Sequence, residues 1–97
     1  MLFHIVEKAF WDSFEGKGHY FPAGFDAEGF IHLSEEQQVA GVLERYYQGV
    51  QHLLLLHLDE SLFTAKLKFE ANLSGELFPH LFGHLNKKSV VKIEEIT

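Results

Sequence analysis

Residues 50–59, with the sequence VQHLLLLHLD, contain four consecutive leucines and have no polar face in their middle. A strand that is apolar on both faces is buried on both sides, so we expect this segment to form the central strand of a β-sheet. The leucine run is also too short to cross a bilayer. Strands are therefore expected on both sides of residues 50–59.

Four further segments have the composition or the alternation of strands. In the sequence LFHIV, His4 shares a face with two aliphatic side chains, while Phe3 and Ile5 point the other way. In the sequence AKLKFEA, apolar side chains alternate with charged ones. The four segments are residues 2–6, 30–34, 65–71 and 89–96.

Two helices are predicted in the first half of the chain. Residues 7–15 place aromatic side chains one helical turn apart, and Gly16 follows as a stop signal. Residues 34–49 form the longer helix, with an apolar stripe and a glycine at its end. Ser34 and Gln37 have the spacing of a capping box at the start of that helix.

Three connecting segments carry turn signals. Residues 16–29 hold four glycines and a proline among aromatic residues, which predicts a loop that forms a lid or a pocket wall. Residues 59–63 suggest one helical turn capped by Asp59. Residues 75–86, GELFPHLFGHLN, are predicted to be a turn-prone loop in which a proline and a glycine bracket His80.

The elements follow one another in the order β-α-β-α-β-turn-β-loop-β. Early helices followed by late strands favour an α+β domain over a doubly wound parallel sheet. A chain of 97 residues is long enough to bury a core and too short for a second domain. We therefore expect one domain, residues 1–97, with two N-terminal helices packed on a mixed, mostly antiparallel β-sheet.

The charge balance and the missing motifs exclude several classes of function. With 14 acidic and 8 basic residues, the net charge is −6, and Arg45 is the single arginine, so no nucleic-acid partner is expected. The absence of cysteine excludes disulfides and zinc–thiolate sites. The chain has no glycine-rich dinucleotide loop, no P-loop and no G-x-S-x-G motif. With no visible signal peptide, a soluble, cytoplasmic protein without a membrane partner is predicted.

Seven histidines are the unusual feature of the composition. Alternation in the segment FIHLS directs Ile31 and Leu33 to the core, so His32 and Ser34 are expected to face outward, where a strand end opens onto a helix N-terminus. His80 and His84 flank the tripeptide LFG, which does not give the spacing of a helical metal site. Imidazoles from different segments could still meet in space at a metal ion.

Several motifs together resemble a known family. They are FHI at the start, HYFPAGFDAEGFIHLS followed by Gln38, then YYQG, LKFE and LFPHLFGHLN. In this combination and order, over nearly the whole chain, they are similar to the small, mainly bacterial family called domain of unknown function 952. That family has been placed near the ADP-ribosyltransferase superfamily. The resemblance therefore implies a split β-sheet whose cleft binds NAD and an attack on the nicotinamide–ribose bond.

The resemblance also implies roles for individual residues. His4 matches the residue that holds the adenosine-side ribose, and His32 matches the ring that stacks on nicotinamide. Either Glu70 or Glu76 matches the late carboxylate that stabilises an oxocarbenium ion, and Glu70 is preferred because it lies on a strand. His80 is the residue most specific to the family, and it is paired with Glu70 as a catalytic candidate. The remaining ligand-binding candidates from the shared motifs are Tyr20, Ser34, Gln38 and Gly83.

Three hypotheses for the function follow. The first is an enzyme that binds NAD or an NAD-derived nucleotide in a histidine-rich cleft, without a metal ion. The second is a non-catalytic module that binds a small molecule or a nucleotide in the same cleft. The third is a metal-assisted hydrolase in which His4, His32 and His80 meet at the metal. In each case we expect a monomer or a weak homodimer.

Overall fold

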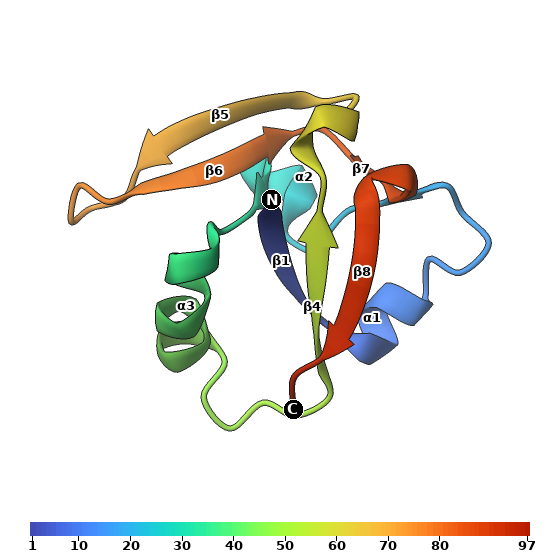
Figure 1. Cartoon of the computed structure of the whole chain (residues 1–97), viewed down its shortest axis with the longest axis horizontal. Coiled ribbons are helices and arrows are strands. Elements are labelled where there is room, and N and C mark those ends of the chain that lie inside the picture. The colour runs from blue at the N-terminus through green and yellow to red at the C-terminus, as the bar shows by residue number, and fades with distance from the viewer.

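Three antiparallel β-sheets form the framework of the protein in the computed structural model, which describes residues 1–97 (Figure 1). The first sheet has the strand order β1-β4-β8, the second pairs β2 with β7, and the third has the order β3-β6-β5. The strands are β1 (Leu2–Glu7), β2 (His19–Tyr20), β3 (Ile31–His32), β4 (Leu53–Leu58), β5 (Lys66–Ala71), β6 (Leu77–Phe82), β7 (Leu85–Asn86) and β8 (Val90–Glu95).

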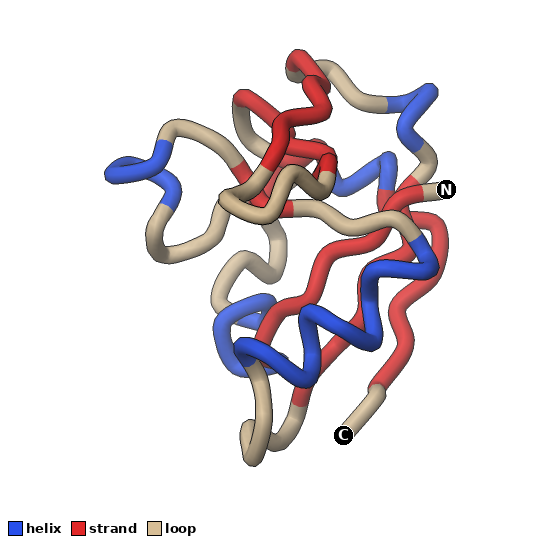
Figure 2. Tube along the Cα trace, turned by 90° about the vertical axis from the view of Figure 1, so that its left-hand side faces the viewer, coloured by secondary structure: helices blue, strands red, loops and turns tan.

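Short helices connect the strands. None of them has the length and apolar composition needed to cross a membrane. In Figure 2, α3 crosses the sheet that contains β1 and β4. The α-helices are α1 (Lys8–Asp12), α2 (Phe25–Glu28) and α3 (Val39–Tyr46), and the 3-10 helices are η1 (Glu36–Gln38), η2 (Glu60–Leu62) and η3 (Lys87–Ser89).

The leucine run is confirmed as the central strand of the first sheet. Strand β4 pairs with β1 on one side and with β8 on the other. Leu54, Leu56 and Leu58 belong to the larger apolar cluster, while Leu53 and Leu55 belong to a smaller cluster on the opposite face, which α3 helps to cover. Each buried leucine contributes about 1.5–3 kcal/mol relative to an exposed one, so β4 stabilises both faces of the sheet.

The alternation of β1 is confirmed as well. Leu2 and Val6 lie in the larger apolar cluster, and Phe3 and Ile5 lie in the smaller one. His4 faces the same side as Leu2 and Val6 and is buried with them. The first strand therefore carries an imidazole into the interior of the protein.

The segment predicted as a turn-prone loop, residues 75–86, instead contains β6, the central strand of the third sheet. A proline is accommodated there because the main chain of Pro79 faces the end of β3, where its carbonyl accepts a hydrogen bond from the N–H of Leu33 at 3.0 Å. Its missing N–H removes no hydrogen bond to β5, with which Pro79 is aligned at Phe69. Local turn signals were outweighed by pairing on both sides.

The predicted pair of N-terminal helices on a mixed sheet is not supported. The structure has three short α-helices spread over the first half of the chain, and every strand pairing is antiparallel. It remains a small α+β fold, but its resemblance to an ADP-ribosyltransferase split sheet is unsupported.

The predicted start of the longer helix is also wrong. Ser34 exchanges two main-chain hydrogen bonds of 2.8 Å with Phe3, so its backbone is engaged in a β-bridge. The capping box is formed one residue later, by Glu35 and Gln38. The predicted cap at Asp59 is confirmed, since its carboxylate accepts a hydrogen bond from the N–H of Ser61 at 3.0 Å.

Candidate functional site

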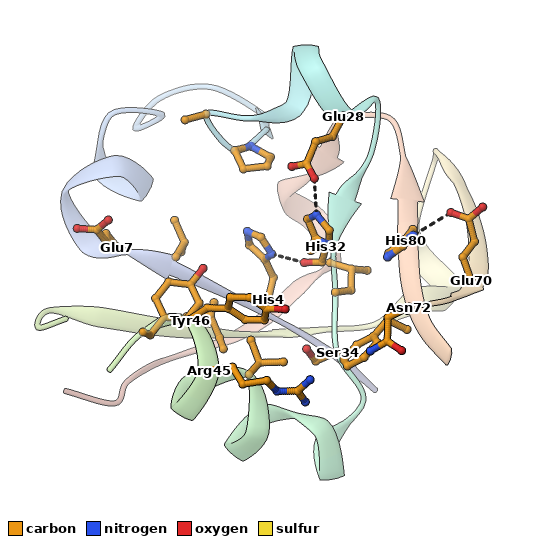
Figure 3. A pocket seen from close by; sticks show the side chains of 18 of the residues that line it. His4, Glu7, Glu28, His32, Ser34, Arg45, Tyr46, Glu70, Asn72 and His80 are labelled. Atoms are coloured by element: carbon orange, nitrogen blue, oxygen red, sulfur yellow. Dashed lines mark hydrogen bonds and ion pairs between the residues drawn. The ribbon is translucent and has the colours of Figure 1, made fainter. Parts of the chain in front are cut away.

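A large pocket lies between β1, α2, α3 and the hairpin formed by β5 and β6 (Figure 3). Its volume is about 950 Å³, and 12 of its 22 lining residues are hydrophobic. This volume is within the range of pockets that bind small molecules and cofactors. The pocket brings together residues from both the first and the third sheet.

Two histidines face each other across paired strands in this pocket. His32 of β3 is aligned with His80 of β6, and their ring centroids are 5.2 Å apart at an angle of 80°. Each ring is held by a carboxylate: His32 Nε2 lies 2.8 Å from Glu28 Oε2, and His80 Nδ1 lies 2.8 Å from Glu70 Oε1. The pocket therefore contains two carboxylate–histidine pairs whose rings are in contact.

The two pairs differ in exposure. The side chain of His80 is 13% exposed and stacks on the ring of Phe30 at a centroid distance of 4.0 Å, whereas the side chain of His32 is 59% exposed. Glu70 accepts a hydrogen bond from His80 Nδ1–H, which leaves Nε2 without a protein partner and directed into the pocket (Figure 3). His80 is thus the more rigidly held of the two rings.

A buried chain of hydrogen bonds connects the main chain of His32 with His4 and Tyr20. His4 Nδ1 lies 2.7 Å from the carbonyl oxygen of His32, and His4 Nε2 lies 2.9 Å from the hydroxyl of Tyr20. Because a carbonyl only accepts, His4 donates from Nδ1 and accepts the Tyr20 hydroxyl proton at Nε2. Burial lowers the pKa of His4 to about 4, although the hydrogen bond to His32 opposes the shift. His4 is therefore neutral near pH 7.

Tyr20 is neutral for the same reason. Burial raises the pKa of its hydroxyl above the ordinary tyrosine value. Since both ring nitrogens of His4 are engaged, His4 positions the main chain of His32, and β1 and β3, which belong to different sheets, are fastened together at this point.

The free edge of β1 gives the pocket a main-chain surface. Phe3 exchanges hydrogen bonds with Ser34, so its N–H and C=O point away from β4. Since these directions repeat every second residue along a strand, the N–H and C=O of Ile5 also point away from β4. β4 pairs with β1 at Ile5, but no strand pairs with β1 there on the side away from β4, and Ile5 lines the pocket. The pocket wall therefore offers an adjacent main-chain donor and acceptor.

Six of the residues predicted for the site line this one pocket. Ser34 is among them, but it is buried rather than outward-facing. Figure 3 shows the side chains of His4, His32 and Ser34 together, with His80 beside them and Glu70 on the outer side of His80. The six residues are His4, Tyr20, His32, Ser34, Glu70 and His80.

Three other candidates lie outside the pocket lining. The buried amide of Gln38 accepts a hydrogen bond from the N–H of Glu35 and donates to the carbonyl of Leu77 at 2.7 Å and to Glu76 at 3.1 Å. Gln38 therefore joins η1 to the start of β6.

Gly83 packs so closely that an added Cβ would lie 2.7 Å from the Cβ of Ala65. Between the two carboxylates left open by the sequence, the pocket contains Glu70 and not Glu76.

Among the pocket residues that sequence reasoning did not assign to the site, three contribute polar groups used below. Glu28 lies four residues before His32, and nothing in a loop sequence shows that a carboxylate at that spacing will reach the ring. Ile5 contributes main-chain atoms, which depend on which strands pair. Arg45 was considered only as the single arginine of the chain, in the argument against a nucleic-acid partner. No three His, Asp or Glu side chains are grouped so that they could hold a metal ion.

Comparisons with known proteins are consistent with a family assignment. The family model described as "Protein of unknown function (DUF952)" matches residues 5–93. The crystal structure of CC0527 from Caulobacter crescentus is 30% identical, with a TM-score of 0.89, over 99% of this chain and 85% of that chain. The solution NMR structure of the same protein has a TM-score of 0.83 at 30% identity, over 98% and 83% of the two chains.

No curated protein matches the sequence. The comparisons give no support for NAD binding, for catalysis or for a place near the ADP-ribosyltransferases. The family match and the CC0527 structures cover nearly the whole chain, with the same fold. The chain belongs to the DUF952 family of proteins of unknown function.

Proposed function

We propose that this protein is an enzyme that transfers protons by general acid–base catalysis on a nucleotide-sized ligand, with His80 as the principal base. The observation that carries the proposal is the pair of carboxylate-held imidazoles, His32 and His80, with rings 5.2 Å apart in one pocket. Imidazole exchanges protons near neutral pH, and a carboxylate on one nitrogen fixes the tautomer and orients the other nitrogen. His80 has this arrangement, with Nε2 open to the pocket.

We further propose NAD or an NAD-derived nucleotide as the ligand. The N–H and C=O of Ile5 match a primary amide, which donates and accepts one hydrogen bond each, as the carboxamide of nicotinamide does. The exposed ring of His32 is available to contact the nicotinamide ring. Tyr46 and Leu73, which are highly exposed apolar side chains of the pocket, add surface for flat groups. The volume of about 950 Å³ accommodates a ligand of this size.

In the proposed reaction, water attacks the ribose carbon that carries nicotinamide. The ribose–nicotinamide bond breaks, and the cationic nicotinamide group leaves with the bonding electron pair as neutral nicotinamide. His80 accepts the proton that water loses, and Glu70 stabilises the imidazolium ion that forms. The negative charge of Glu70 also favours the oxocarbenium-like transition state on the ribose. The products are ADP-ribose, nicotinamide and one proton.

The test combines calorimetric titration with NAD, ADP-ribose and nicotinamide and a chromatographic assay of nicotinamide release. We expect binding and turnover by the natural sequence, and a fall in turnover of roughly 10²- to 10⁴-fold for His80→Gln. His84→Gln is the matched control, because His84 stacks on Phe21 outside the pocket. Glu70→Gln is expected to lower turnover, whereas Glu76→Gln retains it.

Two outcomes would redirect this assignment. Binding of NAD without nicotinamide release, unchanged in His80→Gln, would indicate the non-catalytic nucleotide-binding module. The absence of binding by all three ligands would exclude the NAD assignment.

A further inference from the structure

Arg45 is the only cationic Lys or Arg side chain among the residues that line the pocket. It lies in the last turn of α3, and Figure 3 shows its side chain extending from this helix toward Ser34, on the side of the pocket away from Glu28. Three carboxylates, those of Glu7, Glu28 and Glu70, also line the pocket. An anionic group of a ligand would be repelled by these carboxylates, so Arg45 is the place where it can bind.

Most of the hydrogen-bonding capacity of Arg45 is unused within the protein. A guanidinium group carries five N–H donors. Its Nε donates a long hydrogen bond of 3.3 Å to the carbonyl of Gly41, and one terminal nitrogen lies 3.9 Å from Glu76 in a pair that is about half exposed. An exposed pair at this distance is weak. The two terminal nitrogens therefore remain available for a bidentate contact with an oxyanion.

The glycine one turn before Arg45 explains how the guanidinium is positioned. Gly41 lies within α3, where glycine is unfavourable for helix stability and where its backbone needs no left-handed conformation. A Cβ at residue 41 would lie 3.2 Å from the terminal nitrogen Nη2 of Arg45. That is closer than ordinary van der Waals contact. The missing side chain thus lets the guanidinium lie against the main chain of the helix.

We propose that Arg45, positioned by Gly41, is an anion subsite of the pocket that binds a phosphate or carboxylate group of the ligand. This proposal depends on the proposed function in one respect only, which is that the ligand occupies the same pocket. A planar guanidinium whose terminal nitrogens make no hydrogen bond within the protein matches the oxygen pairs of phosphate and carboxylate. Arg45 is then the residue that selects anionic over neutral ligands.

The test is an NMR titration of the ¹⁵N-labelled protein with sodium phosphate and, separately, with sodium acetate, at constant ionic strength against sodium chloride. We expect saturable shifts of the Arg45 Nε–H and Gly41 N–H signals with a millimolar dissociation constant. Stronger binding of phosphate than of acetate identifies the group as a phosphate, and the reverse order identifies a carboxylate. Shifts no larger than those caused by chloride would overturn the proposal, even if NAD turnover were observed.

Variants separate the subsite from general charge effects. Arg45→Gln is expected to weaken anion binding by about 10-fold or more, because it removes charge-assisted hydrogen bonds. Lys92→Gln removes the same charge from β8, outside the pocket, and leaves binding unchanged. Gly41→Ala raises the denaturation midpoint through its helix propensity and yet weakens anion binding several-fold. If Gly41→Ala stabilises the protein with full anion affinity, the positioning role of Gly41 is excluded.

Discussion

The buried histidine of β1 makes the stability of the fold depend on pH in a defined window. The pKa of His4 is lowered from 6.5 to about 4 in the folded protein. Between these values the unfolded chain takes up a proton at His4 while the folded protein does not. The free energy of unfolding is therefore at its full value above pH 6.5 and falls as the pH is lowered toward 4.

The magnitude follows from the difference between the two pKa values. A difference of roughly 2.5 units at about 1.4 kcal/mol each corresponds to a loss of about 3 kcal/mol. Domains of this size are typically stabilised by only about 5–15 kcal/mol in total, so His4 alone has a measurable effect. The physical reason is that burial desolvates the ring, and around it an imidazolium ion would find only neutral acceptors, the carbonyl of His32 and the hydroxyl of Tyr20.

The assay is urea denaturation, followed through the fluorescence of Trp11, at closely spaced pH values between 7 and 4. Other groups titrate in this window, so the comparison is with His4→Asn, whose amide can donate to the carbonyl of His32 but cannot titrate. We expect the free energy of unfolding of the natural sequence, measured relative to that of His4→Asn, to fall by about 3 kcal/mol as the pH falls from 7 to 4. An NMR titration of the His4 ring is the direct check. A ring that titrates near 6.5 in the folded protein would refute the reasoning.

Two further substitutions test the packing around the site. Gly83→Ala places a Cβ at 2.7 Å from the Cβ of Ala65 and should destabilise the protein by roughly 1–3 kcal/mol, measured by urea denaturation, and adding Ala65→Gly should recover part of the loss. Gln38→Ala leaves the carbonyl of Leu77 without its donor and should cost about 2–3 kcal/mol in the same assay. A neutral result for Gln38→Ala would mean that water replaces the amide.

The strands that were predicted correctly are those in which the pattern of apolar residues within the segment itself determines which faces are buried. The apolar side chains of Leu53–Leu58 and Leu2–Glu7 are buried on the expected faces because their exposure to water is unfavourable on either face of the sheet. Leu77–Phe82 was missed because its proline and the following glycine are local turn signals, while Ile31–His32, which pairs with it on one side, is distant in the sequence. Tertiary pairing decided the structure there.

In the site, too, local pattern predicted some features, and others depended on which strands pair in the fold. His32 was placed outward from alternation alone, and its ring is indeed exposed. The meeting of His4, His32 and His80 in one pocket depends on the β3–β6 register and on the contact between β1 and β3, neither of which can be computed from spacing. Glu28 reaches His32 from a short helix that the sequence presented as loop, so the second carboxylate–histidine pair emerged only from the fold.

The unpaired main chain at Ile5 is shielded from other polypeptides. An open strand edge on a protein surface is a template for self-association, because any extended segment can add to it. Ile5 is only 7% exposed, so an incoming strand cannot reach its N–H and C=O, whereas a compact ligand in the pocket can. The outer strands β5 and β8 are rich in lysine and glutamate, which discourages strand addition. The unpaired main chain of β1 at Ile5 is thus enclosed by the pocket, whereas the open edges of β5 and β8 are protected from strand addition by their charged side chains.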